Sequence, residues 1–229
     1  SSILNSIASS SISENRSIVN AIQQGNPGFE RSRFITKVKK SFMDIQNAWQ
    51  EQDISTVRRY ISDGVYQRFN IQFKMMKLLK QKNIITNLQI HDVKITDYEK
   101  DGDYDVITVA IKASSYDRFE SPIARSLIQA GTETFVEYWT YIKKRGVEEK
   151  DIYHTENCPN CGSNLEHKLG EVSKCIYCNT FVNNGEYDWI LSEITQADDY
   201  VQEKRTKIRN SGFFTMVNAI RKVDETFSI

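Results

Sequence analysis

The four cysteines of the chain stand in two close pairs. Cys158 and Cys161 form one Cys-x-x-Cys pair, and Cys175 and Cys178 form a second pair after thirteen intervening residues. Four thiolates suit the softness and tetrahedral geometry of zinc, and they leave no open position for a water molecule. The spacing therefore predicts one structural zinc ion, held by these four residues in a ribbon that spans about residues 155–182.

Redox-active or disulfide-bonded pairs are the alternative interpretation of the same spacing. Neither pair lies in a βαβ pattern of the thioredoxin kind. Two close pairs are also more typical of a metal site in a reducing compartment than of a secreted disulfide framework. We therefore favour zinc. The chain is then either one domain interrupted by this metal-clamped insert or two domains that flank it.

Length and composition indicate an ordinary globular chain. The 229 residues are enough for one large domain or two small ones, and the apolar share of 39% is enough for a real core. No stretch approaches the 18 consecutive apolar residues of a membrane span. The chain begins with Ser1 rather than Met, so the sequence leaves open an upstream targeting or membrane segment.

The neutral overall charge hides an asymmetry between two parts of the chain. Residues 30–82 contain twelve Lys/Arg and five Asp/Glu, whereas residues 92–156 contain nine and fourteen. An anionic partner would therefore meet the first part. The residues that we expect to bind an anionic membrane or partner are Arg33, Lys37, Lys40, Arg58, Arg59 and Lys74. The alternative is that this basic face is simply solvated.

Three helices are expected to precede a sheet. Asp53 is expected to cap a short helix over residues 54–60, and Ser62-Asp63 to cap a longer one over about residues 65–80. Helical spacing places the following apolar side chains on two stripes: Phe34, Val38, Phe42, Ile45 and Trp49 on the first long helix, and Val65, Phe69, Phe73, Met76 and Leu79 on the last. Arg33, Lys37 and Lys40 would then project from the opposite, exposed side of the first stripe.

The period changes from helix-like to strand-like after Asn83. Alternating apolar residues predict strands with a bulge near His91-Asp92, a hairpin turn at residues 100–103, a strand over residues 133–144 and a last strand over residues 185–194. Because aromatic runs flank the ribbon, we expect Trp139 and Trp189 to lie in neighbouring strands of one sheet. The chain is thus expected to be α+β, with helices covering one face of an antiparallel sheet.

The two ends of the chain are expected to lie outside this domain. Residues 1–27 are rich in serine and end in a Gly/Pro break, so we expect a mobile tail. Residues 197–229 are expected to form a helical extension in which Phe213, Val217 and Ile220 share one face.

Several segments resemble the Tim44-like domain family, and most closely the bacterial relatives of the mitochondrial inner-membrane translocase subunit that carry a zinc ribbon. The segments are residues 45–49 with Asp53, 60–69, 104–109, 137–142, 158–162 and 185–194. The resemblance covers about residues 28–196. It implies a nuclear-transport-factor-two-like (NTF2-like) fold, in which helices cover a curved antiparallel sheet around a pocket. The mitochondrial members lack the ribbon, so their partners do not transfer to this chain.

The resemblance and the basic helices together favour a non-catalytic module that binds or tethers at a membrane, on its cytoplasmic side, with a link to protein transport. Its expected partners are an anionic membrane surface and/or a membrane-bound protein assembly. The alternative is an enzyme or small-ligand binder that uses the pocket, but no paired catalytic constellation supports it, because His91 stands alone. Nucleic acid is not expected, since acidic residues offset the lysines around the ribbon.

Overall fold

The computed structural model describes residue 14, residues 16–122 and 130–166, residue 169, residues 171–197 and residue 199. The elements in chain order are α2 (Arg16–Gly25), α3 (Arg31–Glu51), the 3-10 helix η1 (Ser55–Val57), α4 (Asp63–Leu78), β1 (Lys82–Asp101), β2 (Tyr104–Glu120), β3 (Ala130–Lys144) and β4 (Ile190–Gln196). The four strands form one antiparallel sheet in the order β1-β2-β3-β4.

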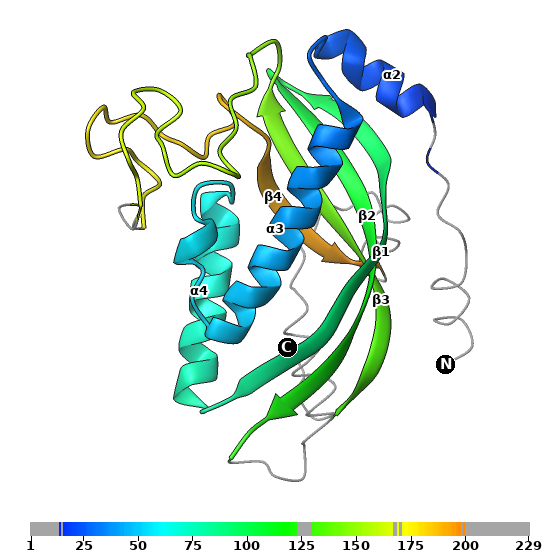
Figure 1. The fold of residues 1–229 in the computed structure, drawn as a ribbon, viewed down its shortest axis with the longest axis vertical. Coiled ribbons are helices and arrows are strands. Elements are labelled where there is room, and N and C mark those ends of the chain that lie inside the picture. The colour runs from blue at the N-terminus through cyan, green and yellow to red at the C-terminus, as the bar shows by residue number, and fades with distance from the viewer. Residues whose placement is uncertain are drawn as a thin grey trace.

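Helices α3 and α4 lie on one side of a curved sheet. Figure 1 shows α3 crossing the face of the sheet, with α4 beside it and α2 near one end of β1. The α+β class and the curved antiparallel sheet are therefore confirmed.

The apolar stripe of α3 fills the space between that helix and the sheet. Phe34, Val38, Phe42 and Ile45 are all 2% exposed or less. Trp49 is partly buried and packs against Phe69 and Phe73 of α4. The expected stripe is confirmed, and its last ring joins the two helices.

Helix α4 begins with the expected cap. The side chain of Ser62 accepts a hydrogen bond from the backbone N of Val65 at 3.2 Å, and Asp63 occupies the first turn. Val65, Phe69, Phe73 and Met76 are buried, as expected. Leu79 was expected on the same buried stripe, and this is wrong: it is 41% exposed. The helix ends at Leu78, so Leu79 follows the helix as its C-cap and is not carried to the core side.

The strands agree with the expected pattern apart from the last one. The β1–β2 register shifts between Ile90 and Asp92, which confirms the predicted bulge, and Gly102 adopts φ +57° in the hairpin turn. The last strand begins at Ile190 rather than Gly185. The preceding segment is irregular because the Asp188 carboxylate accepts hydrogen bonds from the backbone N of Trp189 and from Lys37.

The ribbon leaves the sheet at the end of β3 and returns at the start of β4. Strands β3 and β4 pair directly, with Trp139 opposite Ile194. Trp189 directly precedes β4 and is 1% exposed. The predicted placement of both segments in one sheet is confirmed, although Trp189 lies just outside the strand.

The N-terminal region is more ordered than expected. Residues 16–25 form α2, and Ile22 is fully buried in the core, so a mobile tail is wrong for this part of residues 1–27. Residues 1–13 and 15, and nearly all of the helical extension expected over residues 197–229, lie outside the described residues. Within the described part, no helix is both long and apolar enough to cross a membrane.

The cap of α4 generates a stability prediction. Ser62→Ala should lower the free energy of unfolding by about 1 kcal/mol, because the Val65 amide loses its side-chain acceptor at the helix start. Urea denaturation followed by circular dichroism measures the change. Ser32→Ala, at an exposed position in the first turn of α3, is the control. Equal small effects in both variants would show that the cap contributes nothing.

Candidate metal centre

The first cysteine pair lies in a tight turn, which we call the first knuckle (residues 156–165). The backbone N of Cys158 donates to the O of Ser163 at 2.8 Å, and the N of Gly162 donates to the O of Cys158 at 2.9 Å. Gly162 has φ +75°, a conformation that costs glycine little and other residues more. The turn therefore presents both sulfurs on one side of a hydrogen-bonded backbone.

The second pair repeats this arrangement 17 residues later, in the second knuckle (residues 173–182). The N of Cys175 donates to the O of Thr180 at 2.9 Å, and the N of Asn179 donates to the O of Cys175 at 2.9 Å. Asn179 takes the place of Gly162, with φ +62°. Asparagine tolerates this region better than most residues, so the two turns have the same backbone with different sequences.

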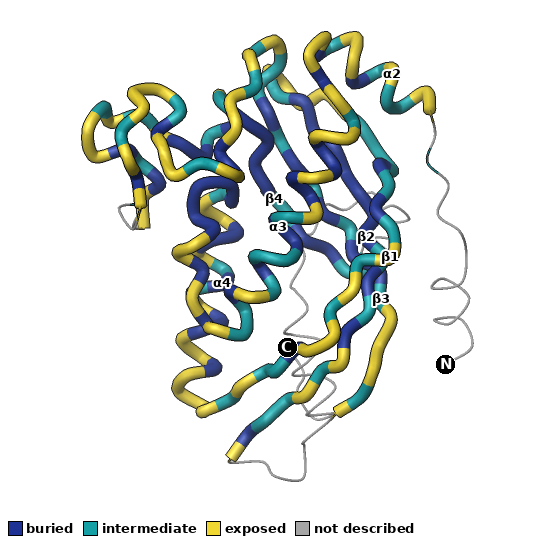
Figure 2. The backbone as a smooth tube through the Cα atoms, viewed as in Figure 1, coloured by how far each residue is buried: buried dark blue, intermediate teal, exposed yellow. Residues whose placement is uncertain are grey.

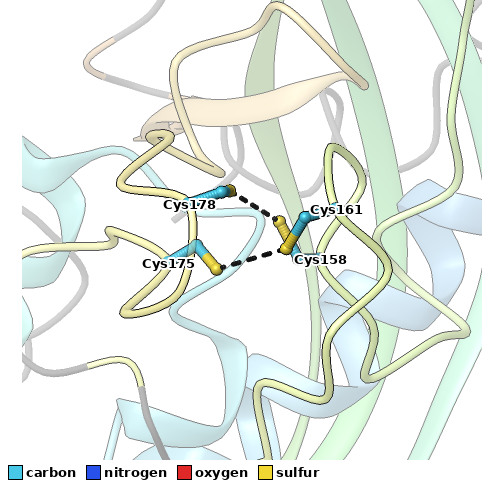
Figure 3. Close-up of side chains that lie close together, drawn as sticks. All are labelled: Cys158, Cys161, Cys175 and Cys178. Atoms are coloured by element: carbon cyan, nitrogen blue, oxygen red, sulfur yellow. Dashed lines mark hydrogen bonds between the residues drawn. The ribbon is translucent and has the colours of Figure 1, made fainter.

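The four sulfurs meet between the knuckles. The Sγ atoms of Cys158 and Cys178 are 3.7 Å apart, those of Cys161 and Cys175 are 3.8 Å apart, and all four lie within 4.8 Å of one another. Figure 3 shows the side chains pointing toward a common centre. Zinc–sulfur bonds of about 2.3 Å in a tetrahedron separate the sulfurs by about 3.8 Å. The donor set and its spacing therefore fit a metal ion better than disulfide bonds.

Local hydrogen bonds favour thiolates on part of this cluster. Burial raises the pKa of Cys158 to about 12. Burial acts in the same direction on Cys175, but the Ser163 hydroxyl and the backbone amides of Cys178 and Tyr177 outweigh it and lower that pKa to about 6. A cluster that gives up a proton at neutral pH is prepared to bind a cation.

Consecutive arginines attach the ribbon to the helices. Arg58 donates to the O of Glu171, just before the second knuckle, at 2.9 Å. Arg59 donates to the O of Thr155, just before the first knuckle, at 2.5 Å, and pairs with Glu156 at 2.8 Å. Arg58 is 0% exposed and Arg59 is 9% exposed. The expectation that both arginines face an external anionic partner is wrong, because the ribbon covers them.

Lys37 was expected on the exposed side of α3, but the structure buries it. Its Nζ donates to both carboxylate oxygens of Asp188, at 2.8 and 2.9 Å, and pairs with Glu149. Both Lys37 and Asp188 are 2% exposed or less. The expected exposed row of three cations on α3 is therefore wrong: the core side of the helix is wide enough to include Lys37, and two carboxylates from the segment after β3 neutralise it.

The remaining residues of the expected basic face do lie at the surface to some degree. Arg33 is exposed and pairs with Glu30 at 3.1 Å, and Lys40 is partly exposed and pairs with Asp44 at 2.7 Å. Lys74 is exposed on α4, whereas Arg33 and Lys40 belong to α3. The structure therefore does not bring the six predicted residues together. Sequence reasoning missed Asp188 and Glu149 as the partners of Lys37, and no local spacing indicates them.

The buried ion pair of Lys37 should contribute much more to stability than an exposed ion pair on the same helix. Lys37→Ala should lower the free energy of unfolding by about 3–5 kcal/mol, because it leaves Asp188 as an unpaired buried charge. Lys40→Ala on the same helix removes an ion pair that is about one-third exposed, and it should cost less than about 1 kcal/mol. Urea denaturation of both variants measures the difference. Similar losses for the two would contradict the burial of Lys37.

Comparison with known proteins places the chain in a family. A family model described as "Tim44-like domain" matches residues 16–152, which is more than half of the chain and ends before the first cysteine. No curated protein matches. The intermembrane space region of the chloroplast protein ARC6 is a similar solved structure, with 8% identity, a TM-score of 0.41 and coverage of 73% of this chain and 96% of that chain. On the family match, the chain belongs to the Tim44-like domain family.

Proposed function

We propose that this chain is a non-catalytic, membrane-associated module that binds or tethers proteins connected with transport across or into a membrane. The observation that carries the proposal is the family match over residues 16–152, which includes α2, α3, α4, β1, β2 and β3. The match supports a membrane-linked binding role. We propose in addition that the fold is NTF2-like, that the chain tethers its partners and that it acts on the cytoplasmic side of the membrane.

The packing between α3 and the sheet supports binding through the outer surface. Aromatic rings meet there closely: Phe34 lies 5.5 Å from Tyr141 and 5.4 Å from Trp189 between ring centroids, and Phe42 lies 5.3 Å from Trp139. A pocket enzyme or small-ligand binder would need this volume for its ligand. In this protein, the aromatic side chains of α3 and the sheet fill the space between them where such a ligand would bind.

We further propose that the ribbon binds one structural zinc ion through Cys158, Cys161, Cys175 and Cys178. The two matching knuckles and the sulfur separations near 3.8 Å support this assignment. Four thiolates would fill the coordination shell, so the ion would organise the ribbon and carry out no chemistry of its own. Through Arg58 and Arg59, an organised ribbon in turn fixes the loop before α4.

Zinc content tests the metal assignment. Protein purified without added metal should contain close to one equivalent of zinc, because closed thiolate sites bind tightly enough to survive purification. Cys161→Ser should lose the metal, whereas Ile176→Ser, at an exposed position next to Cys175 that supplies no thiol, should keep it. Elemental analysis with thiol titration measures both. A wild-type protein with little zinc and its cysteines in disulfides would contradict the assignment.

Flotation with vesicles tests the membrane proposal. The wild-type protein should float with vesicles of phosphatidylcholine and phosphatidylglycerol at low salt and should remain at the bottom with phosphatidylcholine alone. Rising salt should release it, since each lysine or arginine near an anionic surface contributes about 1 kcal/mol that salt screens. Equal flotation with both kinds of vesicle, or none with either, would reject an electrostatic membrane contact.

A further inference from the structure

Helix α4 carries a second apolar face that the core does not use. Ile71, Met75 and Leu78 follow the i, i+4, i+7 spacing of one helical stripe. Their exposed fractions are 57%, 41% and 82%. At 100° per residue this stripe lies nearly opposite the buried face formed by Phe69 and Met76. In Figure 2, exposed positions are coloured yellow along the side of α4 that faces away from the sheet.

Among the described residues, these three side chains belong neither to the buried core nor to the partly buried side chains that pack against it. The buried face already anchors α4 against α3 and the sheet. Lysine, glutamine or glutamate would form the helix equally well at the outer positions, without placing large apolar groups in water. A grouped apolar stripe on a surface helix is typical of a contact site.

The charged residues within the stretch of sequence that contains this stripe are all basic, although Asp53, in the loop after α3, interacts electrostatically with Lys77. Between Asp63 and Asp92 the chain contains no acidic residue, and it contains the following basic residues: Arg68, Lys74, Lys77, Lys80 and Lys82. The four lysines are exposed. Lys74 lies about 60° from Ile71 around the helix, which places its charge beside the apolar stripe. The long stem of a lysine lets its ammonium group reach outward while the helix lies flat on a surface.

We propose that α4 docks in the interface of an anionic bilayer, with Ile71, Met75 and Leu78 between the acyl chains and the lysines at the lipid phosphates. This inference rests on the proposed function and replaces the expected basic face on α3. Lysine is depleted at protein–protein interfaces, and leucine is uncommon among their energetic anchors. Apolar residues flanked by lysine are instead typical of helices that lie in the membrane interface. A bilayer is therefore the occupant that the composition of the stripe favours.

Two variants on α4 and one control variant on α3 test the inference by flotation with vesicles of phosphatidylcholine and phosphatidylglycerol. Ile71→Ser/Met75→Ser/Leu78→Ser should bind at least about tenfold more weakly, because the insertion of apolar area is lost. Lys74→Gln/Lys77→Gln should also bind about tenfold more weakly. Arg33→Gln/Lys39→Gln makes the same change of charge on exposed positions of α3 and should leave binding nearly unchanged. All variants should keep the wild-type melting temperature and zinc content.

A fluorescence measurement on the full chain separates lipid contact from protein contact. The tryptophan introduced by Leu78→Trp should be quenched by brominated lipids in the anionic vesicles and should show a blue shift only when vesicles are added. The Thr36→Trp variant, changed on the exposed side of α3, should show neither effect. Of the three native tryptophans, Trp139 and Trp189 are 1% exposed or less, and Trp49 is partly buried against Phe69 and Phe73 of α4. The wild-type protein, measured with and without vesicles, gives the signal of all three for subtraction.

The outcomes distinguish this inference from the proposed function. Equal vesicle binding by the wild type and the α4 variants overturns the α4 contact and leaves the membrane proposal standing. No binding by the wild type overturns both. If the fluorescence of the Leu78→Trp variant is already blue-shifted without lipid, protein covers the stripe and the α4 membrane contact is overturned. Analytical ultracentrifugation then shows whether the covering protein is a second copy of the chain, because a second copy would give dimers.

Discussion

The arrangement of the ribbon depends on the interactions of one buried group, the guanidinium of Arg58. It donates to the O of Ile61 at 3.3 Å and to the O of Glu171 at 2.9 Å, pairs with Asp63, and lies 4.3 Å from the ring centre of Tyr66. A charge removed from water is tolerated only when such partners surround it. The loop after α3, the start of α4 and the second knuckle are therefore held in one relative position.

Lys37 has the corresponding role for the segment that returns to the sheet. It joins α3 to Asp188, which also accepts from the backbone N of Ile152 at 3.1 Å. The apolar stripes hold the helices against the sheet. They do not fix one exact position, because the burial of apolar surface is not directional and allows small shifts. The two buried cations require specific partners, and they fix where the inserted ribbon and its flanks contact the helical layer.

Features set by neighbours in the sequence could be predicted, and features set by distant partners could not. The spacing of Phe34 and Val38, the cap at Ser62 and the two cysteine pairs are local signals, and each has the expected counterpart in the structure. Lys37 has a partner 151 positions away, so its helical position alone suggested water rather than Asp188. The buried stripe through Phe69 and Phe73 was predicted from its spacing, whereas the exposed stripe through Ile71 was not among the predicted features.

The position of the ribbon has a consequence for how the sheet closes. Ile142 on β3 pairs with Ile190 on β4, 48 positions later, and the cross-link between Cys158 and Cys178 would bypass 20 of those positions. Shortening the loop from 48 to about 28 positions lowers the entropic free-energy cost of closing it by only about 0.5 kcal/mol. A bound ion would thus help β4 to find β3 very little as a shortcut. The ribbon is instead an excursion from the sheet that is held at its own residues by Arg58 and Arg59 and at its flanks by Lys37.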